Sequence, residues 1–130
     1  MKYFLDNCLS PKYAAMLTAV SATDTVVMAL RQEYEESTPD EEWIPKLGAN
    51  GWVLISKDRE QRKKPELRKA LAQNRVTAFY LAKSFDHQPL MEVAWRLVKY
   101  WSKITHMGQN SRKGSQFLVD INGGVEVLPP

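Results

Sequence analysis

The sequence has few of the residues that build disulfide frameworks or zinc sites. Its 130 residues include one cysteine, Cys8, and two histidines, His87 and His106. A single cysteine excludes an internal disulfide, and these three residues do not have the Cys/His spacing of a zinc finger. Any metal ion bound by this chain is therefore expected to have oxygen ligands.

A long apolar run is also missing. At the N-terminus the charged Asp6 follows only the apolar stretch Tyr3-Phe4-Leu5, which is too short for the core of a signal peptide or for a membrane span. We therefore expect no membrane segment and a cytoplasmic location. With 44% hydrophobic residues, a chain of 130 residues can bury one sizeable core, so a single domain over residues 1–130 is expected.

The net charge of +3 is small, but the charges are segregated along the chain. Residues 31–42 contain six acids and one base, whereas residues 57–75, which we call the basic block, contain eight bases and three acids. Such a block could follow the phosphates of a nucleic acid. An ordinary solvated helix face would produce the same pattern, because lysine and arginine are mostly exposed wherever they occur.

Short apolar runs alternate with segments of helical periodicity. Strands are expected at residues 2–5, 25–30, 52–55, 76–81, 117–121 and 125–128, and helices at 11–20, 39–47, 65–71 and 89–104. The third strand is followed by Ser56, and residues 108–114 should form a polar loop. Thr38 is predicted to be the N-cap of the second helix, with Glu41 closing a capping box, and Gly48 or Gly51 should end that helix.

This alternation predicts an α/β fold. Parallel strands joined by helical crossovers form a three-layer α/β/α domain with a central, mostly parallel sheet, here followed by a C-terminal helix and a β-hairpin. The core should span residues 1–106 and the hairpin residues 115–130.

Three aspartates occupy positions where such a fold collects ligand-binding groups. Asp6 directly follows the first strand, Asp58 lies just beyond the third, and Asp40 opens a helix. Ligands bind beyond the carboxyl ends of parallel strands, so these side chains could converge there and hold a divalent cation such as Mg²⁺. Each aspartate also has a purely structural explanation: a favourable helix-dipole interaction for Asp40, and a turn or cap for the other two.

The motifs around these aspartates resemble a known family. The segments 3–11 (YFLDNCLSP), 40–44 (DEEWI) and 51–58 (GWVLISKD) are similar to PIN-like domains of the VapC toxin type, and the resemblance covers residues 1–81. It implies a Mg²⁺- or Mn²⁺-dependent ribonuclease, often the toxin of a toxin–antitoxin pair. Carried over by position, it makes Asp6, Asp40 and Asp58 the catalytic acids, with Ser56 as a hydroxyl partner and Asn7 as a supporting residue.

Two departures from the family pattern leave an alternative open. PIN-like domains often have a further acid after the second strand, and here Glu33, Glu35 and Glu36 cannot be assigned to it, while Glu41 could substitute as a metal ligand. The Asp-Phe pair that often follows the last motif is replaced by residues 59–62 (REQR). The alternative is a catalytically inactive descendant that binds RNA or an acidic protein partner.

The expected mechanism is hydrolysis of RNA by a metal-activated water, with one or two ions held by the three aspartates. Bases beside and beyond Asp58 would contact the RNA backbone: Lys57, Arg59, Arg62, Lys63 and Lys64. A receiver-type phosphoacceptor or a haloacid-dehalogenase-type phosphotransferase fits less well, because each needs another acid near Asp6 where Asn7 and Cys8 stand. Cys8 is expected to be a small buried residue beside the site. The C-terminal hairpin could pair through its edge with a second copy or an antitoxin.

Overall fold

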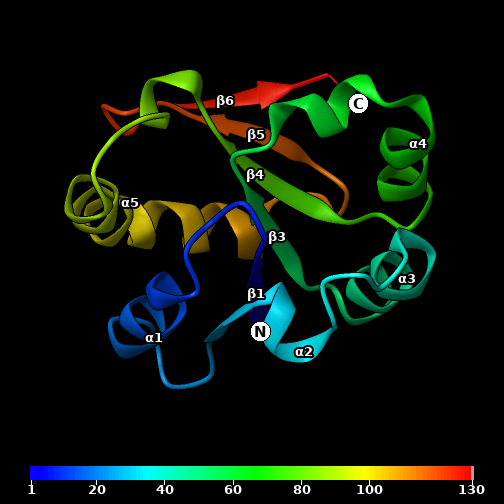
Figure 1. Ribbon diagram of the computed structural model, residues 1–130, viewed down its shortest axis with the longest axis horizontal. Coiled ribbons are helices and arrows are strands. Elements are labelled where there is room, and N and C mark those ends of the chain that lie inside the picture. The colour runs from blue at the N-terminus through cyan, green and yellow to red at the C-terminus, as the bar shows by residue number, and fades with distance from the viewer. Residues whose placement is uncertain (130) are drawn as a thin grey trace.

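The computed structural model describes residues 1–129, and Gln61 through its backbone only. Pro130, the last residue of the expected hairpin segment 115–130, lies outside the described residues. Six strands form one sheet in the order β2-β1-β3-β4-β5-β6 (Figure 1). They are β1 (Lys2–Leu5), β2 (Val26–Ala29), β3 (Val53–Ser56), β4 (Thr77–Leu81), β5 (Gln116–Val119) and β6 (Val125–Leu128).

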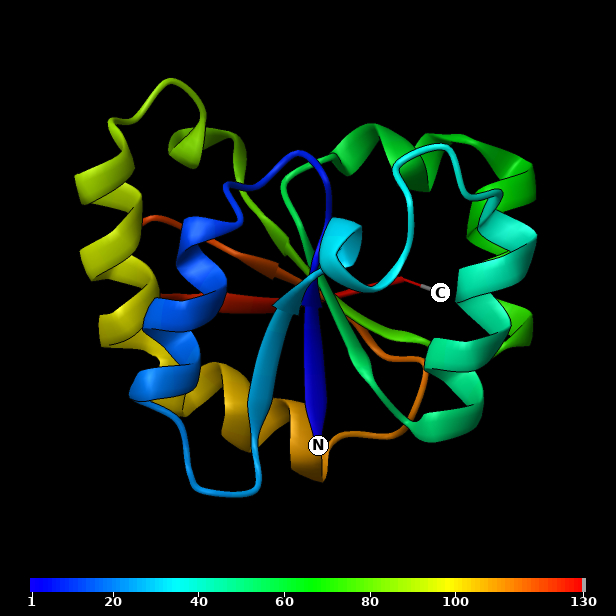
Figure 2. The same cartoon turned by 60° about the horizontal axis from the view of Figure 1, so that its bottom comes forward.

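Helices cover both faces of this sheet. They are α1 (Lys12–Ala19), α2 (Leu30–Glu33), α3 (Asp40–Asn50), α4 (Pro65–Gln73) and α5 (Leu90–Asn110), with 3₁₀ turns η1 (Arg59–Lys63) and η2 (Lys83–Phe85). Figure 2 shows α1 and α5 on one face and α3 and α4 on the other. The predicted three-layer α/β/α fold is therefore confirmed. The expected hairpin forms as well and extends the same sheet, because β5 pairs parallel with β4, and β6 antiparallel with β5.

The alternation of side chains along β1 divides the core in two. Tyr3 and Leu5 pack into the apolar cluster beneath α1 and α5, whereas Phe4 packs into the cluster beneath α3 and α4. Successive residues of a strand point to opposite faces, so a strand buried on both sides must be apolar throughout. The same alternation carries Asp6 and Ser56 to the α3 and α4 face, since each lies two residues beyond a residue of that cluster.

The chain changes direction across the sheet at β1. It leaves β1 for β2 on one side and returns to β3 on the other, with Leu5 opposite both Ala29 and Ile55. In parallel α/β sheets, the crevice at such a switch point is the usual ligand-binding position. Asp6 stands at this position, at the carboxyl end of β1 between β2 and β3.

Two local predictions are wrong. Thr38 does not cap α3, which begins at Asp40 without any side-chain cap, so the predicted capping box is absent. The long helix does not end near residue 104 but continues to Asn110, through part of the predicted polar loop. Gly108 permits this extension, because a Cβ atom there would lie 2.6 Å from the hydroxyl of Tyr3. Gly51, with φ 66°, ends α3 as expected.

A membrane-spanning helix must be both long and apolar. None of the helices in residues 1–129 is long and apolar enough to cross a bilayer. The longest, α5, is amphipathic and buries one face that includes Leu97, Trp101 and Ile104 against the sheet.

Candidate functional site

Asp6 is the most constrained acid of the molecule's crevice. Its backbone N–H donates to the carbonyl of Ile55 at 2.9 Å, which continues the β1–β3 ladder one residue past β1. Its side chain is only 8% exposed. One carboxylate oxygen accepts the Ser56 hydroxyl at 2.8 Å, and the other accepts the backbone N–H of Asn7 at 2.8 Å. These bonds fix the direction of the carboxylate and compensate for its burial.

Ser56 connects Asp6 to the second aspartate. It is fully buried, and its oxygen accepts the backbone N–H of Asp58 at 2.9 Å while its hydrogen is donated to Asp6. The Sγ of Cys8 lies 3.5 Å from the same oxygen. Since the single hydroxyl hydrogen already serves Asp6, the thiol is the donor in this contact. The hydroxyl of Ser56 therefore joins the loop after β1, through Asp6 and Cys8, to the loop after β3, through Asp58.

Asp58 and Asp40 are each anchored by a local hydrogen bond. Asp58 is half-buried, and one of its carboxylate oxygens accepts the backbone N–H of Glu60 at 3.2 Å at the start of η1. Asp40, the first residue of α3, accepts the indole N–H of Trp43 at 3.1 Å. In each case one carboxylate oxygen makes the structural contact, and the carboxylate retains further acceptor capacity for a ligand.

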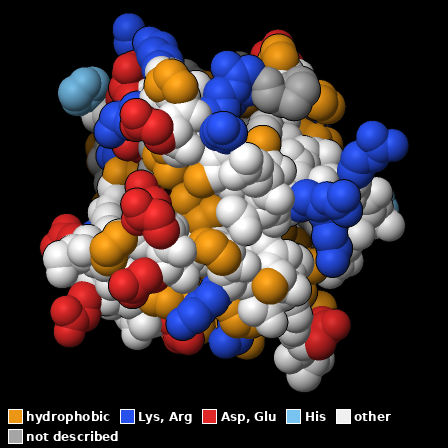
Figure 3. Space-filling view, turned by 90° about the vertical axis from the view of Figure 1, so that its right-hand side faces the viewer, with side chains coloured by type: hydrophobic (Ala, Val, Ile, Leu, Met, Phe, Trp, Pro, Cys, Tyr) orange, Lys and Arg blue, Asp and Glu red, His pale blue; other side chains and the backbone are white. Residues whose placement is uncertain are grey.

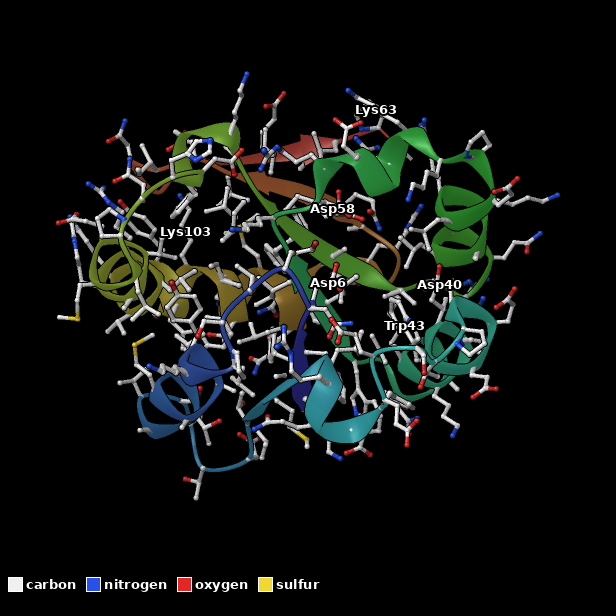
Figure 4. The ribbon with its side chains drawn as sticks, viewed as in Figure 1. Asp6, Asp40, Trp43, Asp58, Lys63 and Lys103 are labelled. Atoms are coloured by element: carbon white, nitrogen blue, oxygen red, sulfur yellow. The ribbon has the colours of Figure 1, made fainter. Side chains whose placement is uncertain are left out.

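The three aspartates line one cavity. Its volume is about 220 Å³, and Figure 4 shows Asp6, Asp58 and Asp40 arranged around it from β1, the loop after β3 and α3. Its other lining residues come from the loop after β1, the 30–38 segment, α3 and α4: Asn7, Leu30, Tyr34, Glu35, Glu36, Thr38, Trp43, Lys64 and Leu67. Acids that are distant in the sequence are thus gathered at the carboxyl end of the sheet.

The glutamates of the cavity differ from the one expected. Glu41 is exposed on α3 and is not among the lining residues, whereas Glu35 and Glu36 are. They reach the cavity because α2 turns the chain immediately after β2, so the segment before α3 passes over the crevice. The acidic run 31–42 was the only sequence signal for these two glutamates. The path of this segment over the crevice depends on α2, a helix that the apolar pattern did not predict.

Comparison with known proteins gives one match. The family model described as PIN like domain matches residues 1–83, which include β1 to β4 and all three aspartates. This chain belongs to the PIN-like domain family. The searches of curated proteins and of solved structures found no match. Membership in the PIN-like family indicates a nuclease-type module, and the crevice described above lies within the matched segment.

The acids of this PIN-like domain fit a divalent ion that keeps part of its hydration shell. Among residues 1–129, no group of three or more His, Cys, Asp or Glu side chains is close enough to surround an ion directly. Mg²⁺ requires less, because it usually binds one or two protein carboxylates and keeps several waters. Asn7 supports this fit: it lines the cavity, and its Oδ1 is buried without a hydrogen-bond partner. An ion or its hydration water would satisfy that oxygen.

The five expected RNA-binding bases of the PIN-like domain have different surroundings. Lys64 lines the acidic cavity itself. Lys63 is exposed and pairs with Glu60 at 3.1 Å, and Lys57 is half-buried. Arg62 donates to the backbone carbonyl of Pro129.

Arg59 is bound on several sides by the protein. Its guanidinium donates to the carbonyls of Lys57 and Leu81 at 2.9 and 2.7 Å, and to the carboxylate of Asp86 at 2.5 Å. These bonds join η1 to the end of β4 and the turn after η2, so Arg59 holds the rim of the crevice in place. A guanidinium with these partners has little freedom left to bind a phosphate.

Cys8 does not have the expected burial. The residue as a whole is exposed, although its sulfur faces Ser56. Desolvation of the sulfur raises the pKa of the Cys8 thiol, and the nearby charge of Asp6 raises the pKa further. A thiol with a raised pKa is a weak nucleophile at neutral pH, so Cys8 is not suited to covalent catalysis.

Proposed function

We propose that this PIN-like domain is a Mg²⁺- or Mn²⁺-dependent endoribonuclease in which Asp6, Asp40 and Asp58 hold the ion, one or two of them directly and the remainder through its waters. The observation that carries the proposal is the convergence of these acids on one cavity, with the buried carboxylate of Asp6 held by Ser56. When bound, a divalent ion polarises the phosphoryl oxygens and makes a water sufficiently acidic to attack phosphorus. Glu35 and Glu36 at the same cavity could complete the set of acids.

The chain's own residues have three roles in this proposal. Asp6 presents its carboxylate in a fixed direction, since Ser56 and Asn7 bind both of its oxygens. Lys64 places a positive charge beside the acids, where it can bind a phosphate oxygen of the substrate. No side chain of the crevice is suited to attack, because the Ser56 hydroxyl is buried and committed to Asp6. Water is therefore the nucleophile.

A toxin role is the finer part of the proposal and rests on the resemblance of the opening and strand motifs. The partner in that case is an antitoxin protein, and the cell compartment is the cytoplasm. The edge strand β6 supports a pairing surface, because it ends the described sheet and its Val127 is 67% exposed. A second copy of the chain could use the same edge. Size-exclusion chromatography that showed a strict monomer at high concentration would remove the homodimer.

The deciding experiment is cleavage of a labelled mixed RNA pool by the purified protein with Mg²⁺, Mn²⁺ or EDTA. Asp6→Asn should abolish cleavage, since it removes the buried charge and keeps the shape of the side chain. Asp24→Asn is the control, because Asp24 is exposed at the opposite end of the sheet, before β2. Metal-independent cleavage, or full activity of Asp6→Asn, would overturn the proposal. Salt-sensitive RNA binding without cleavage would instead support the inactive RNA-binding module.

A further inference from the structure

We propose that Arg75, Arg112 and Lys113 form a second phosphate-binding site, which holds single-stranded RNA outside the acidic cavity. We call it the amino-end basic site, because Arg75 precedes β4 and the other two precede β5. This inference rests on the proposed function for the identity of the ligand, RNA, but does not depend on the cleavage chemistry. The acidic cavity lies at the other end of the sheet, beyond the carboxyl ends of β1 and β3.

The first observation is a surface hollow with only basic lining. A hollow of about 460 Å³ is lined by Arg75, Arg112 and Lys113 alone. A second hollow of about 330 Å³ contains the same three residues together with uncharged ones from α4, β5 and β6. Among the described residues no acid lines either hollow and no carboxylate forms a salt bridge with the three bases. Three neighbouring positive charges without a counterion favour the binding of an anion.

The second observation is the backbone that presents Arg75. Its φ is 54°, in the left-handed region that favours glycine or asparagine, and the chain nevertheless has an arginine there. Gly114, with φ 90°, packs against it, since a Cβ atom at Gly114 would lie 3.3 Å from the Cα of Arg75. The turn before β4 and the loop before β5 are therefore held together. A charged residue in this conformation motivates the hypothesis that its side chain has a function.

The third observation connects this site to the acidic cavity. Lys64, directly before α4, lines the acidic cavity, Arg68 lies one turn further along α4, and Arg75 follows the end of that helix. Arg62 and Arg68 line a small hollow that adjoins the amino-end basic site, because both share the lining residues Ala72, Gly114 and Gln116. The nine residues of α4 span about 14 Å, so one strand of RNA can contact both ends. Figure 3 shows this side of the molecule, with acidic side chains on one part and groups of basic side chains on others.

A purely structural role for the bases gives a different expectation. Arg75 follows the C-terminus of α4, and a Cβ atom at Gly51, which ends α3, would lie 3.0 Å from the Nζ of Lys113. Cations near helix C-termini interact favourably with the helix dipole. In that case the removal of the bases would lower the melting temperature and leave RNA affinity unchanged, which would overturn the proposal.

The test is the affinity for a labelled oligouridylate in EDTA, measured as a function of salt. The variant combines Arg75→Asn, which suits the left-handed backbone, with Arg112→Ala and Lys113→Ala. The control removes three exposed lysines on or near the opposite helical layer, through Lys12→Ala, Lys83→Ala and Lys99→Ala. A phosphate contact to single-stranded RNA contributes about 0.7 to the slope of log K against log salt, so the loss of three contacts should lower that slope by about 2. We expect at least a roughly tenfold loss of affinity near 0.1 M salt, with little change in the control.

Further measurements separate this inference from the nuclease proposal. A wild-type protein that binds the oligouridylate but does not cleave RNA would refute the nuclease and retain the amino-end basic site. In an active protein, the variant should cleave a trinucleotide as well as the wild type does and bind long RNA less well. Three outcomes would overturn the inference. The variant and the wild type could bind RNA with equal affinity, or neither could bind it, or polyglutamate could compete for the site as strongly as RNA does. If the triple variant does not fold, Arg112→Ala alone should lower the slope by about 0.7.

Discussion

The hydroxyl of Ser56 lies 2.8 Å from a carboxylate oxygen of Asp6 and accepts the backbone N–H of Asp58 at 2.9 Å. One fully buried side chain thus sets both the direction of the first aspartate and the start of the loop that carries the second. Because β1 and β3 are adjacent and parallel, this link crosses the switch point of the sheet. The crevice is therefore constructed around a hydrogen bond between two strands, and its acids depend on that bond for their placement.

Ser56→Ala should destabilise the protein and reduce cleavage. It removes one hydrogen bond from the buried carboxylate of Asp6, which keeps the N–H of Asn7, and it removes the acceptor of the Asp58 N–H. Such losses typically amount to about 1–3 kcal/mol. Urea denaturation measures the free energy of unfolding. Ser84→Ala is the matched control, because Ser84 is exposed in η2 and should change stability by less than about 0.5 kcal/mol. Equal stability of the two variants would mean that the Ser56 bond contributes little.

Divalent ions should raise the melting temperature of the wild-type protein. An ion that binds only the folded state stabilises it by RT ln(1 + [L]/Kd), or about 2.7 kcal/mol when its concentration is one hundred times Kd. Asp6→Asn and Asp58→Asn should abolish this increase in Mn²⁺, measured by thermal unfolding against an EDTA reference. The readout is independent of catalysis, so it also applies to an inactive domain. An unchanged increase in both variants would place the ion elsewhere.

Thermal unfolding in Mn²⁺ also tests which glutamate, Glu36 or Glu41, contributes to ion binding. Glu36→Gln should weaken the stabilisation by Mn²⁺ more than Glu41→Gln does, because Glu36 lines the cavity and Glu41 does not. Both side chains are exposed, so neither change should alter stability in EDTA by more than about 0.5 kcal/mol. A larger effect of Glu41→Gln would restore Glu41 as the expected ligand.

The fold could be predicted from the sequence because its main signals are local. Apolar runs such as 52–55 must be strands buried on both faces, and Asp6 and Asp58 follow two such runs. The structure brings Asp6 and Asp58 close together for the reason that the pattern gave, namely that neighbouring parallel strands end at one edge. The predicted beginning of α3 lies one residue too early, because Thr38-Pro39 has the sequence of a capping box without its hydrogen bonds.

Other features depend on contacts between segments distant in the sequence. The helical continuation past residue 104 follows from the close approach of Gly108 to Tyr3, which no local pattern contains. Glu35 and Glu36 reach the crevice through the short helix α2. Arg59 belongs to the basic block by sequence, but its partners Leu81 and Asp86 lie more than 20 residues away along the chain. Charge alone could not show that this arginine is held by the protein.

Arg59→Lys should therefore affect stability more than RNA binding. A lysine cannot donate to two carbonyls and a carboxylate in the planar arrangement of a guanidinium, so we expect a loss of about 1–2 kcal/mol in the free energy of unfolding. Lys63→Ala is the comparison: its exposed pair with Glu60 should contribute less than about 1 kcal/mol. RNA affinity should fall in Lys63→Ala and stay nearly unchanged in Arg59→Lys. The reverse pattern would make Arg59 a direct RNA contact.

Tyr80 provides a prediction on pH, since it lies opposite Ser56 in the sheet and its buried hydroxyl has no hydrogen-bond partner. Burial raises the pKa of Tyr80 to about 12 from an ordinary value of 10.0. The folded state then holds the phenolic proton more tightly than the unfolded state. This contribution to stability is fully present below pH 10 and is lost as the pH rises towards 12.

Tyr80→Phe should remove the dependence of stability on pH that comes from this residue, on the order of 2 kcal/mol across that range. At neutral pH it should leave stability unchanged or raise it, because an unpaired buried hydroxyl is lost.

Tyr3→Phe is the matched control: burial raises the pKa of Tyr3 to about 12 as well, but its hydroxyl donates to the carbonyl of Thr105 at 3.3 Å. It should flatten the alkaline limb and lower stability at neutral pH by up to about 1 kcal/mol. Urea denaturation between neutral and alkaline pH measures both effects, and a destabilised Tyr80→Phe at neutral pH would show that the hydroxyl has a partner in solution.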